Sequence, residues 1–320
     1  MKLSIVIPVY NVEDYITKCL ESVINQGLEQ NDYEIIIVND GSPDHSMDVV
    51  ADFVESHKGL NVKVINQQNS GVGAARNKGL SAATGKYVFF LDSDDWIEPN
   101  CIPALIEYAD NNNLDVLCFA GQYVYPDGKT SLLKVSYEES GKIYNGEDFI
   151  CVVGMSSSSN MSLYSIQYLR NNGVRYYEGI LYEDREFTPR SYVLADRIAY
   201  VNKICYNYYF KRQNSITNSK NYSRYSKDYL KVADSLCSFA EEHFRNNERV
   251  FKKFMEFVMI SFTRSIVYNT GSVPYSAYKS KHYYPFDLDN IQDQRIVKKG
   301  RLANISLRMF HICSKILHKS

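Results

Sequence analysis

The chain has 320 residues, of which 45% are hydrophobic and 23% charged, and its formal net charge at pH 7 is -1. These values are ordinary for a folded protein that forms one large domain, or one domain with a substantial extension. The near-zero net charge excludes a general electrostatic attraction to nucleic acid, so we expect no nucleic-acid partner.

The seven cysteines are scattered along the chain and include no Cys-x-x-Cys pair. This odd, unpatterned count favours reduced thiols in a cytosol over a disulfide framework or a zinc site. The apolar run near the amino terminus contains Pro8 and soon meets Glu13 and Asp14, so it predicts a first strand rather than a signal peptide. No stretch approaches the ~18 apolar residues of a membrane-spanning helix. We therefore expect a cytoplasmic protein, at most peripheral on the inner face of the membrane.

The first hundred residues alternate between strand and helix patterns. Short apolar runs predict strands at 3–9, 33–39, 62–66 and 87–91. Helices are expected from a cap at Asn11 and Asp14 to about residue 26, over 44–57, over 70–83 with Gly85 as the closing residue, and from 101 to about 110. Strands that alternate with helices predict an α/β fold, with a mostly parallel sheet and helices on both faces.

The pattern changes after the first third of the chain. Two strand-like runs, 116–125 and 131–136, flank a Pro-Asp-Gly turn and predict a hairpin. Further on, 223–268 has helical periodicity and is expected to form two helices that break near Asn246 and Asn247.

The carboxyl-terminal segment 294–320 contains seven Lys or Arg residues and no Asp or Glu. Apolar side chains recur in it at helical spacing, at Leu302, Ile305, Met309, Ile312 and Ile316. This spacing predicts one basic amphipathic helix, which would lie on an anionic membrane surface or dock on its own domain or on a homodimer partner. We place a first domain at 1–218 and a helical carboxyl-terminal extension at 219–320.

The apolar strand at 87–91 runs directly into three carboxylates, Asp92, Asp94 and Asp95. Clustered negative charge beside a buried strand is costly unless a cation lies there. Ligands of open α/β sheets bind at the carboxyl ends of the strands, and carboxylate oxygens suit Mg²⁺ or Mn²⁺. The pattern is therefore typical of a divalent cation site, and the alternative is an acidic loop that caps the helix after Pro99.

Further polar residues are candidates for binding or catalysis. Asp40 follows the second strand, where a carboxylate accepts hydrogen bonds from a base or a ribose, or stabilises a turn. Arg76 lies in a helix rich in small residues and would contact a phosphate or a carboxylate, or form a buried ion pair. Asp184 lies at a helix start, where acids are common, and near a leaving group it would serve as a general base. Arg212 and Ser215 lie in a polar loop that would clamp a diphosphate or form a solvated turn.

Together and in this order, these motifs resemble those of the inverting family 2 glycosyltransferases. The motifs are IVIPVYN (5–11), VNDGSPDHS (38–46), NSGVGAARNKG (69–79), FLDSDDW (90–96), LYEDREF (181–187) and YYFKRQNSIT (208–217). The resemblance covers about residues 2–218. It implies the GT-A fold and transfer of a sugar from a nucleotide donor, usually UDP-linked, with inversion at the anomeric carbon. The stretch SSSSNMSL (156–163) differs from the Trp-Asn-Lys-Leu-like stretch frequent in relatives, in a region that helps to shape the acceptor side.

The resemblance also implies roles for individual residues on the donor side. Asp40 would contact the uracil, with Pro8 and Tyr10 lining the nucleoside pocket. Asp94 would ligate a Mn²⁺ or Mg²⁺ ion that bridges the diphosphate, and Asp92 would contact the ribose or the metal.

On the acceptor side, Asp184 would deprotonate the incoming hydroxyl, while Arg76, Arg212 and Ser215 would complete the nucleotide site. The expected function is transfer from a UDP-sugar to a glycan or lipid-linked acceptor in bacterial surface polysaccharide synthesis. A non-catalytic nucleotide- or glycan-binding scaffold is disfavoured because the key carboxylates are all present. A sugar nucleotidyltransferase is disfavoured because the first strand leads into Pro-Val-Tyr-Asn rather than a loop rich in glycine and basic residues.

Overall fold

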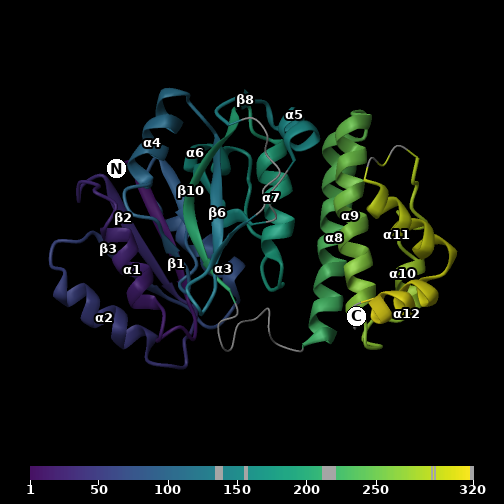
Figure 1. The fold of residues 1–320 in the computed structure, drawn as a ribbon, viewed down its shortest axis with the longest axis horizontal. Coiled ribbons are helices and arrows are strands. Elements are labelled where there is room, and N and C mark those ends of the chain that lie inside the picture. The colour runs from purple at the N-terminus through teal and green to yellow at the C-terminus, as the bar shows by residue number, and fades with distance from the viewer. Residues whose placement is uncertain (134–139, 155–157, 211–220, 290, 292, 318–320) are drawn as a thin grey trace. The chain divides into compact units, whose positions relative to one another are not determined.

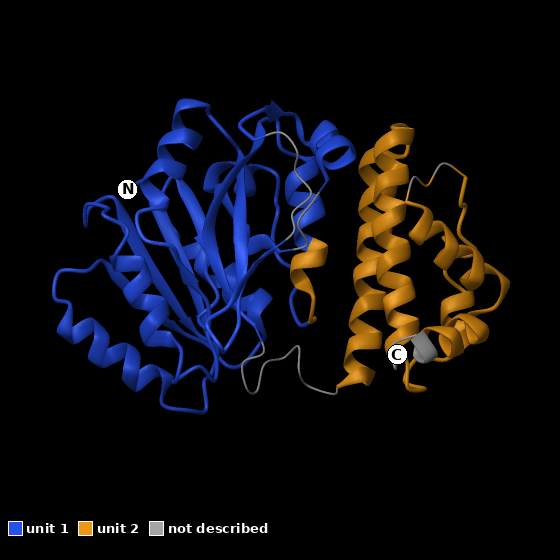
Figure 2. Ribbon diagram, in the orientation of Figure 1, with its two compact units in different colours: residues 1–179, 187–218 blue, residues 180–186, 219–320 orange. Residues whose placement is uncertain are grey.

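The computed structural model describes residues 1–320 apart from 134–139, 155–157, 211–220, 290, 292 and 318–320. The chain forms two compact units (Figure 2). Unit 1 consists of residues 1–179 and 187–218, and unit 2 consists of residues 180–186 and 219–320. The short segment 180–186 therefore belongs to the same compact unit as the carboxyl-terminal helices.

Unit 1 is built on one sheet, which has ten strands within the described residues. The main order is β3-β2-β1-β4-β9-β6-β10-β5, with β7 beside β6 and β8 beside β10 (Figure 1). The strands are β1 (Leu3–Val9), β2 (Tyr33–Asn39), β3 (Val62–Asn66), β4 (Tyr87–Phe90), β5 (Trp96–Ile97), β6 (Val116–Val124), β7 (Thr130–Leu132), β8 (Ile143–Tyr144), β9 (Ser162–Ser165) and β10 (Ile198–Tyr209). Neighbours among β1 to β4 pair in parallel, as do β6 and β10, whereas β9 runs antiparallel between β4 and β6. The predicted α/β fold with a mostly parallel sheet is confirmed.

Helices cover both faces of this sheet. Ile5 and Ile7 of β1 share a buried core with Ile16 of α1 (Ile16–Ile24). Val6 points to the opposite face, where Gly79 of α3 (Val72–Ala82) comes so close that a Cβ on Gly79 would collide with the Val6 side chain. Since successive strand residues face opposite sides, β1 needs a layer of helices on each side.

The first 218 residues contain seven further helices among the described residues. They are α2 (Ser46–Ser56), α4 (Ile102–Asn111), α5 (Gly146–Asp148), η1 (Phe149–Val153), η2 (Ser159–Met161), α6 (Ile166–Asn171) and α7 (Glu183–Val193). The predicted hairpin is present as β6 and β7, which pair antiparallel, while part of the run 131–136 lies outside the described residues.

Two predicted helix ends are wrong. Asn11 does not cap α1, because its φ is 56° and the helix begins only at Ile16. Gly85 does not close α3, which ends at Ala82. It lies instead against β1, where a Cβ would come 2.7 Å from the carbonyl carbon of Leu3. The N–H of Asn11 donates to Ser42 Oγ at 2.8 Å. In both cases a contact between distant segments, rather than the local helix pattern, accounts for the residue.

Unit 2 contains the predicted pair of long helices, α8 (Tyr222–Phe244) and α9 (Glu248–Tyr268). The break falls where it was expected, and the Asn247 side chain accepts a hydrogen bond from the backbone N–H of Val250 and so caps α9. Three shorter helices follow: α10 (Tyr275–Lys279), α11 (Gln294–Ile305) and α12 (Leu307–Leu317). No helix in the described part of the chain is both long enough and apolar enough to cross a membrane.

The prediction of one continuous amphipathic helix in the carboxyl-terminal segment is wrong. Ser306 is extended, with φ of -161°, and it separates α11 from α12. The break changes which side chains share a face. Ala303, Leu307 and Phe310 are the buried residues at this junction, whereas three residues of the predicted apolar stripe are exposed, namely Ile305, Met309 and Ile312.

Candidate active site

Three loops with candidate residues leave the same edge of the sheet. Strands β1, β2 and β4 are parallel, so their carboxyl ends lie together. Asp40 and Asp92 each follow one of these ends, and Tyr10 follows the third. Pro8 is buried within β1, whereas Tyr10 is 44% exposed. This is the edge at which open α/β sheets bind their ligands.

The Asp40 carboxylate holds the loop that leads into α3. One of its oxygens accepts hydrogen bonds from Gln67 Nε2 and from the N–H of Ser70, both at 2.8 Å. The other accepts from the N–H of Gly71 at 2.9 Å. Asp40 is thus buried and stabilises this loop by hydrogen bonds, as the alternative interpretation of Asp40 as a turn aspartate predicted. A carboxylate has about four acceptor sites, so contact with a base remains compatible with these bonds.

Asp92 is held from two sides. Arg76 Nη2 donates to its Oδ1 at 2.6 Å, and Asn160 Nδ2 donates to its Oδ2 at 2.5 Å. The Arg76 side chain is 4% exposed and stacks its guanidinium over Tyr176, with the carbon 5.1 Å from the ring centroid. Arg76 therefore forms a buried ion pair, and a contact of Arg76 with phosphate stays a prediction.

Asn160 is a site residue that the sequence reasoning missed. It lies in η2, within the SSSSNMSL stretch that was assigned to the acceptor side, and it is 4% exposed. Its Nδ2 also lies 3.0 Å from the hydroxyl oxygen of Tyr206, on β10. The only sequence signal for Asn160 was the departure of this stretch from the pattern of relatives.

Asp95 forms the buried end of the same network. Its carboxylate accepts hydrogen bonds from the Tyr206 hydroxyl at 2.5 Å and from the N–H of Tyr209 at 2.8 Å. Burial and the nearby charges of Asp94 and Asp92 raise the pKa of Asp95 well above its usual range. Asp95 therefore anchors the cluster to β10 from inside the fold.

The donor set of this cluster fits a divalent cation. Three carboxylates lie within four positions, so negative charges that repel one another are concentrated at the end of a buried strand. A hard cation would relieve this repulsion, and oxygen ligands suit Mn²⁺ or Mg²⁺. Asp94 is partly exposed, whereas Asp95 is 2% exposed. Asp92 is partly exposed as well, so Asp92 and Asp94 are the two of these carboxylates that an ion can reach from solvent.

The loops after β1 and β2 are tied together by Asp44. Its carboxylate accepts hydrogen bonds from the hydroxyls of Ser42 and Ser46 at 2.6 and 2.7 Å, and from the N–H of Glu13 at 2.9 Å. Desolvation by itself would raise the pKa of Asp44, but these hydrogen bonds outweigh it and lower the pKa to about 2. Asp44 thereby links the loop that begins at Tyr10 to the turn after Asp40.

The predicted base Asp184 belongs to unit 2. Its segment is anchored to α8: the Tyr182 ring stacks on Tyr229 with centroids 4.0 Å apart, and the N–H of Leu181 donates to Asp228 Oδ2 at 3.1 Å. Asp184 is partly exposed at the first turn of α7, and its Oδ1 accepts from the N–H of Arg185. Its role as a base stays a prediction.

Arg212 and Ser215, two predicted nucleotide-binding residues, lie outside the described residues. Tyr209 ends β10 shortly before them. Because the N–H of Tyr209 donates to Asp95, the carboxyl end of β10 is fixed to the carboxylate cluster.

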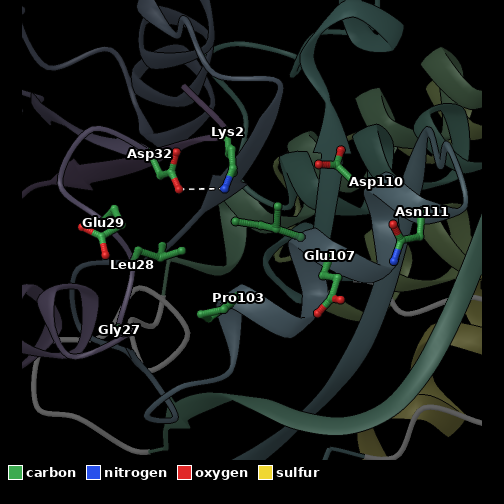
Figure 3. Close-up of a pocket in the computed structure, with 10 residues that line it drawn as sticks. Lys2, Gly27, Leu28, Glu29, Asp32, Pro103, Glu107, Asp110 and Asn111 are labelled. Carbon is green, nitrogen blue, oxygen red and sulfur yellow. Dashed lines mark hydrogen bonds and ion pairs between the residues drawn. The ribbon is translucent and has the colours of Figure 1, made fainter.

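A hollow of about 400 Å³ lies at the opposite edge of the sheet (Figure 3). Lys2 lines it directly before β1 begins, and its Nζ lies 2.7 Å from Asp32 Oδ2. Glu29, Glu107 and Asp110 also line it. Since it is at the amino end of β1, it is separate from the candidate site described above.

Comparison with known protein families and curated proteins gives consistent matches. The family model "Glycosyl transferase family 2" matches residues 4–173. The putative glycosyltransferase EpsH of Bacillus subtilis (strain 168) is 35% identical over 214 residues, which are 64% of this chain and 60% of EpsH. Glycosyltransferase GlyA of Streptococcus pneumoniae serotype 4 is 33% identical over 222 residues, 66% of this chain and 31% of GlyA. The chain thus spans less than two thirds of the length of these two relatives.

A third relative extends over most of the chain. The cholesterol galactosyltransferase of Borreliella burgdorferi is 26% identical over 297 residues, 88% of this chain and 81% of that protein. Among solved structures, residues 1–349 of Staphylococcus aureus TarS in complex with UDP-GlcNAc match with a TM-score of 0.71 at 22% identity, over 98% of this chain and 89% of that one. The mannosyltransferase PcManGT from Pyrobaculum calidifontis, in complex with GDP-Man and Mn²⁺, matches with a TM-score of 0.57 at 12% identity, over 98% and 86% of the two chains. At these identities the structural likeness concerns the fold.

Proposed function

Because the chain belongs to glycosyl transferase family 2 and has the GT-A fold, we propose that it transfers a sugar from a UDP-sugar to a hydroxyl group of a glycan or lipid-linked acceptor. The observation that carries this proposal is the braced cluster of Asp92, Asp94 and Asp95 at the carboxyl edge of the sheet. The complex of TarS with UDP-GlcNAc supports a UDP-linked donor, and the cholesterol galactosyltransferase supports a lipid as one class of acceptor. We propose that this activity serves the synthesis of a bacterial surface polysaccharide.

The donor would bind with its diphosphate at the carboxylate cluster. Asp94 would be the principal ligand of Mn²⁺ or Mg²⁺, since both oxygens of Asp92 already accept short hydrogen bonds from Arg76 and Asn160. Asp92 would contact the ribose or complete the ligand set. When bound, the ion neutralises the charge that develops on the departing diphosphate.

The nucleoside would lie over the loops after β1 and β2. Tyr10 offers an exposed ring, Pro8 closes the floor of the pocket, and Asp40 accepts a hydrogen bond from the uracil. Arg212 and Ser215, which lie outside the described residues, would bind the diphosphate. Asp44 holds these two loops together, because its carboxylate accepts hydrogen bonds from Glu13 of one loop and Ser46 after the other.

Asp184 would act as the general base. It takes the proton of the acceptor hydroxyl while that oxygen bonds to the anomeric carbon and the bond from this carbon to the diphosphate breaks. UDP leaves with the bonding electrons, and one in-line displacement inverts the configuration. The stacking of Tyr182 on Tyr229 supports this role, because it holds the base-bearing segment in place.

A panel of nucleotide sugars tests the proposal without knowledge of the acceptor. We expect one UDP-sugar to raise the melting temperature and to be slowly hydrolysed, in both cases only with Mn²⁺ or Mg²⁺ present. GDP-linked and dTDP-linked sugars serve as controls. Stabilisation by UDP without turnover of any sugar would favour the non-catalytic scaffold. Formation of UDP-sugar from UTP and a sugar phosphate would indicate a nucleotidyltransferase, and no effect of any UDP compound would contradict the proposal.

We also propose that α11 and α12 contact an anionic membrane surface, where a lipid-linked acceptor would lie. Ile305, Met309 and Ile312 are 76%, 52% and 60% exposed. Arg301 and Arg308 are exposed nearby in the sequence, and residues 294–320 contain no acidic side chain. Apolar side chains surrounded by basic ones match the acyl and headgroup layers of an anionic leaflet. A second copy of the chain, in a homodimer, is the alternative occupant of this surface.

A further inference from the structure

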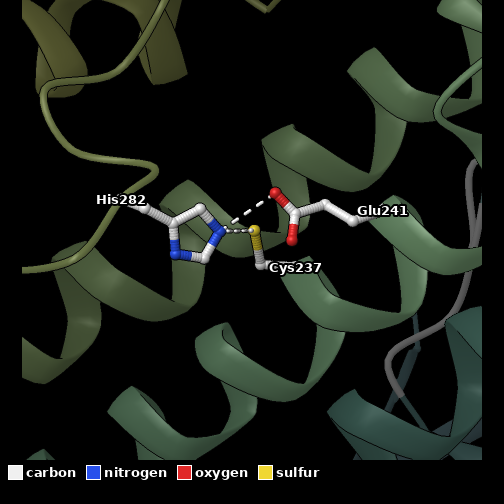
Figure 4. Close-up of side chains that lie close together, drawn as sticks. All are labelled: Cys237, Glu241 and His282. Carbon is white, nitrogen blue, oxygen red and sulfur yellow. Dashed lines mark hydrogen bonds and ion pairs between the residues drawn. The ribbon is translucent and has the colours of Figure 1, made fainter.

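Three side chains with metal-binding atoms converge in unit 2 (Figure 4). Cys237 and Glu241 lie one turn apart on α8, and His282 lies in the segment after α10. His282 Nε2 is 3.5 Å from Cys237 Sγ and 3.0 Å from Glu241 Oε1. The three ligand atoms all lie within 4.8 Å of one another.

These separations are close to those around a tetrahedral zinc ion. With Zn–S of about 2.3 Å and Zn–N and Zn–O of about 2.0–2.1 Å, sulfur and nitrogen ligands are separated by about 3.5 Å, and nitrogen and oxygen ligands by about 3.4 Å. The corresponding separations in the protein are 3.5 and 3.0 Å. Both separations are thus within about 0.4 Å of those around a zinc ion.

The segment that carries His282 is already fixed to α8 on both sides of this residue. Lys281 Nζ lies 2.5 Å from Asp234 Oδ2, and the Tyr283 hydroxyl donates to Asp234 Oδ1 at 2.8 Å. Asp234 precedes Cys237 by three residues, so it lies on the same face of α8. Binding a metal would thus require little ordering of the backbone, which favours affinity.

We propose that Cys237, Glu241 and His282 form a binding site for a transition-metal ion of the zinc class, which clamps the segment after α10 to α8. The site goes beyond the proposed sugar transfer and is chemically distinct from it, because a thiolate and an imidazole select softer ions than an all-carboxylate site does. The Glu241 and His282 side chains are 30% and 62% exposed, so an ion can enter from solvent. Water would take the fourth position.

Binding at this site has a proton signature. Burial and the nearby charges of Glu241 and Asp234 raise the pKa of Cys237 to about 12, so the thiol is protonated at neutral pH without a metal. The metal bonds to sulfur, the S–H bond breaks, and the proton goes to solvent. Release of the Cys237 proton should therefore accompany binding of the ion.

Titration of the full chain with Co²⁺ as a spectroscopic probe and with Zn²⁺ as the competitor tests the site. We expect one Co²⁺ to produce a thiolate-to-cobalt charge-transfer band, which the carboxylate cluster at Asp94 cannot produce, and Zn²⁺ to abolish it. Cys237→Ser should remove the band, and His282→Ala should weaken Zn²⁺ binding by at least about tenfold. His243→Ala, which removes an exposed imidazole from the same helix, and Cys313→Ser, which removes a partly exposed thiol, are the matched controls.

His282 is exposed, so its alanine variant is expected to fold, and circular dichroism of each variant checks this. Zn²⁺ should also raise the melting temperature of the wild type, and less so that of His282→Ala. A cobalt complex without a thiolate band, or Zn²⁺ binding that is equal in wild type and His282→Ala, would overturn the proposal. The three side chains would then be only a hydrogen-bonded cluster. Activity with UDP-sugars does not enter these measurements, so they are independent of the proposed function.

Discussion

At the scale of single residues, the three carboxylates after β4 differ in environment although they are nearly adjacent in sequence. Asp95 is buried and bonded to Tyr206 and Tyr209. Asp92 is held by Arg76 and Asn160. These hydrogen bonds fix the carboxylates on either side of Asp94, the residue that we propose as the principal metal ligand.

Substitution of Asp94 tests its proposed role as a metal ligand. We expect Asp94→Ala to lower the Mn²⁺-dependent affinity for UDP by at least about tenfold, because a charged ligand of the ion is lost. The free energy of unfolding should change by less than about 1 kcal/mol, since the side chain is partly exposed. Calorimetric titration with UDP, with and without Mn²⁺, measures the first quantity and urea unfolding the second.

Asp52→Ala is the matched control for Asp94, because it removes an exposed carboxylate of α2 in the same unit. It should leave the affinity for UDP unchanged. Unchanged UDP affinity in Asp94→Ala would contradict the metal assignment, whatever the control shows.

At the scale of elements, the site depends on loops that side chains hold together. Asp44 illustrates this, since it joins the loop after β1 to the turn after β2. Because its folded pKa of about 2 lies below the ordinary value of about 3.9, ionised Asp44 stabilises the folded state above pH ~4. This contribution is lost as the pH falls from ~4 through ~2.

We therefore predict that Asp44→Asn is less stable than the wild type at pH 6 and that the difference shrinks between pH 4 and pH 2. Urea midpoints across this range measure the effect. Asp48→Asn, which alters an exposed carboxylate of α2, is the control and should show a smaller difference at pH 6. A stability difference for Asp44→Asn that is constant from pH 6 to pH 2 would refute the linkage.

The proposed contact of α11 and α12 with a membrane depends on their exposed apolar and basic side chains. Replacing Ile305, Met309 and Ile312 together by Ser should reduce cosedimentation with vesicles that contain phosphatidylglycerol by at least about tenfold, because the buried apolar area is lost. Replacing Arg301 and Arg308 by Gln should reduce cosedimentation with these vesicles by about fivefold per charge at low salt. The reduction should be smaller at high salt, because salt screens the attraction between arginines and headgroups.

Vesicles of phosphatidylcholine alone are the lipid control, and Lys58→Gln, an exposed lysine of unit 1, is the protein control. Gel filtration of the same variants tests the alternative occupant. The membrane proposal fails if the serine variant binds vesicles like the wild type but elutes as a monomer where the wild type elutes as a dimer. This surface would then be a homodimer interface.

At the scale of the whole molecule, the residues proposed for sugar transfer are divided between the two compact units. The proposed donor-binding residues that the structure describes belong to unit 1, whereas Asp184 belongs to a segment of unit 2 that is bonded to α8.

We accordingly predict that Asp184→Asn keeps the Mn²⁺-dependent affinity for UDP within about twofold while transfer falls at least about hundredfold, because an amide cannot accept the proton of the hydroxyl. Steady-state transfer to the acceptor and UDP titration measure the two effects. Glu242→Gln, an exposed change on α8, should affect neither. Transfer by Asp184→Asn within a few-fold of the wild type would mean that another residue is the base.

Much of this protein could be predicted from its sequence. The order of strands and helices in the first hundred residues, the break between α8 and α9 and the family follow from local periodicity and from motifs that are contiguous in the chain. The acidic cluster was found for the same reason, since Asp92, Asp94 and Asp95 lie within four positions. Local patterns of this kind depend only on neighbouring residues, so the chain alone was sufficient for them.

Only the tertiary structure decided which distant residues meet. Asn160 braces Asp92 from 68 positions away, and His282 reaches Cys237 across 45 positions. The tertiary structure also decided that Ile305 and Met309 are exposed. The extended backbone at Ser306 rotates one half of the expected apolar stripe relative to the other. The sequence by itself determined the family and the strand that leads into the acidic cluster, and the proposed type of chemistry rests on both. The packing determined how these carboxylates are held, since hydrogen bonds between distant segments leave no periodic signal along the chain.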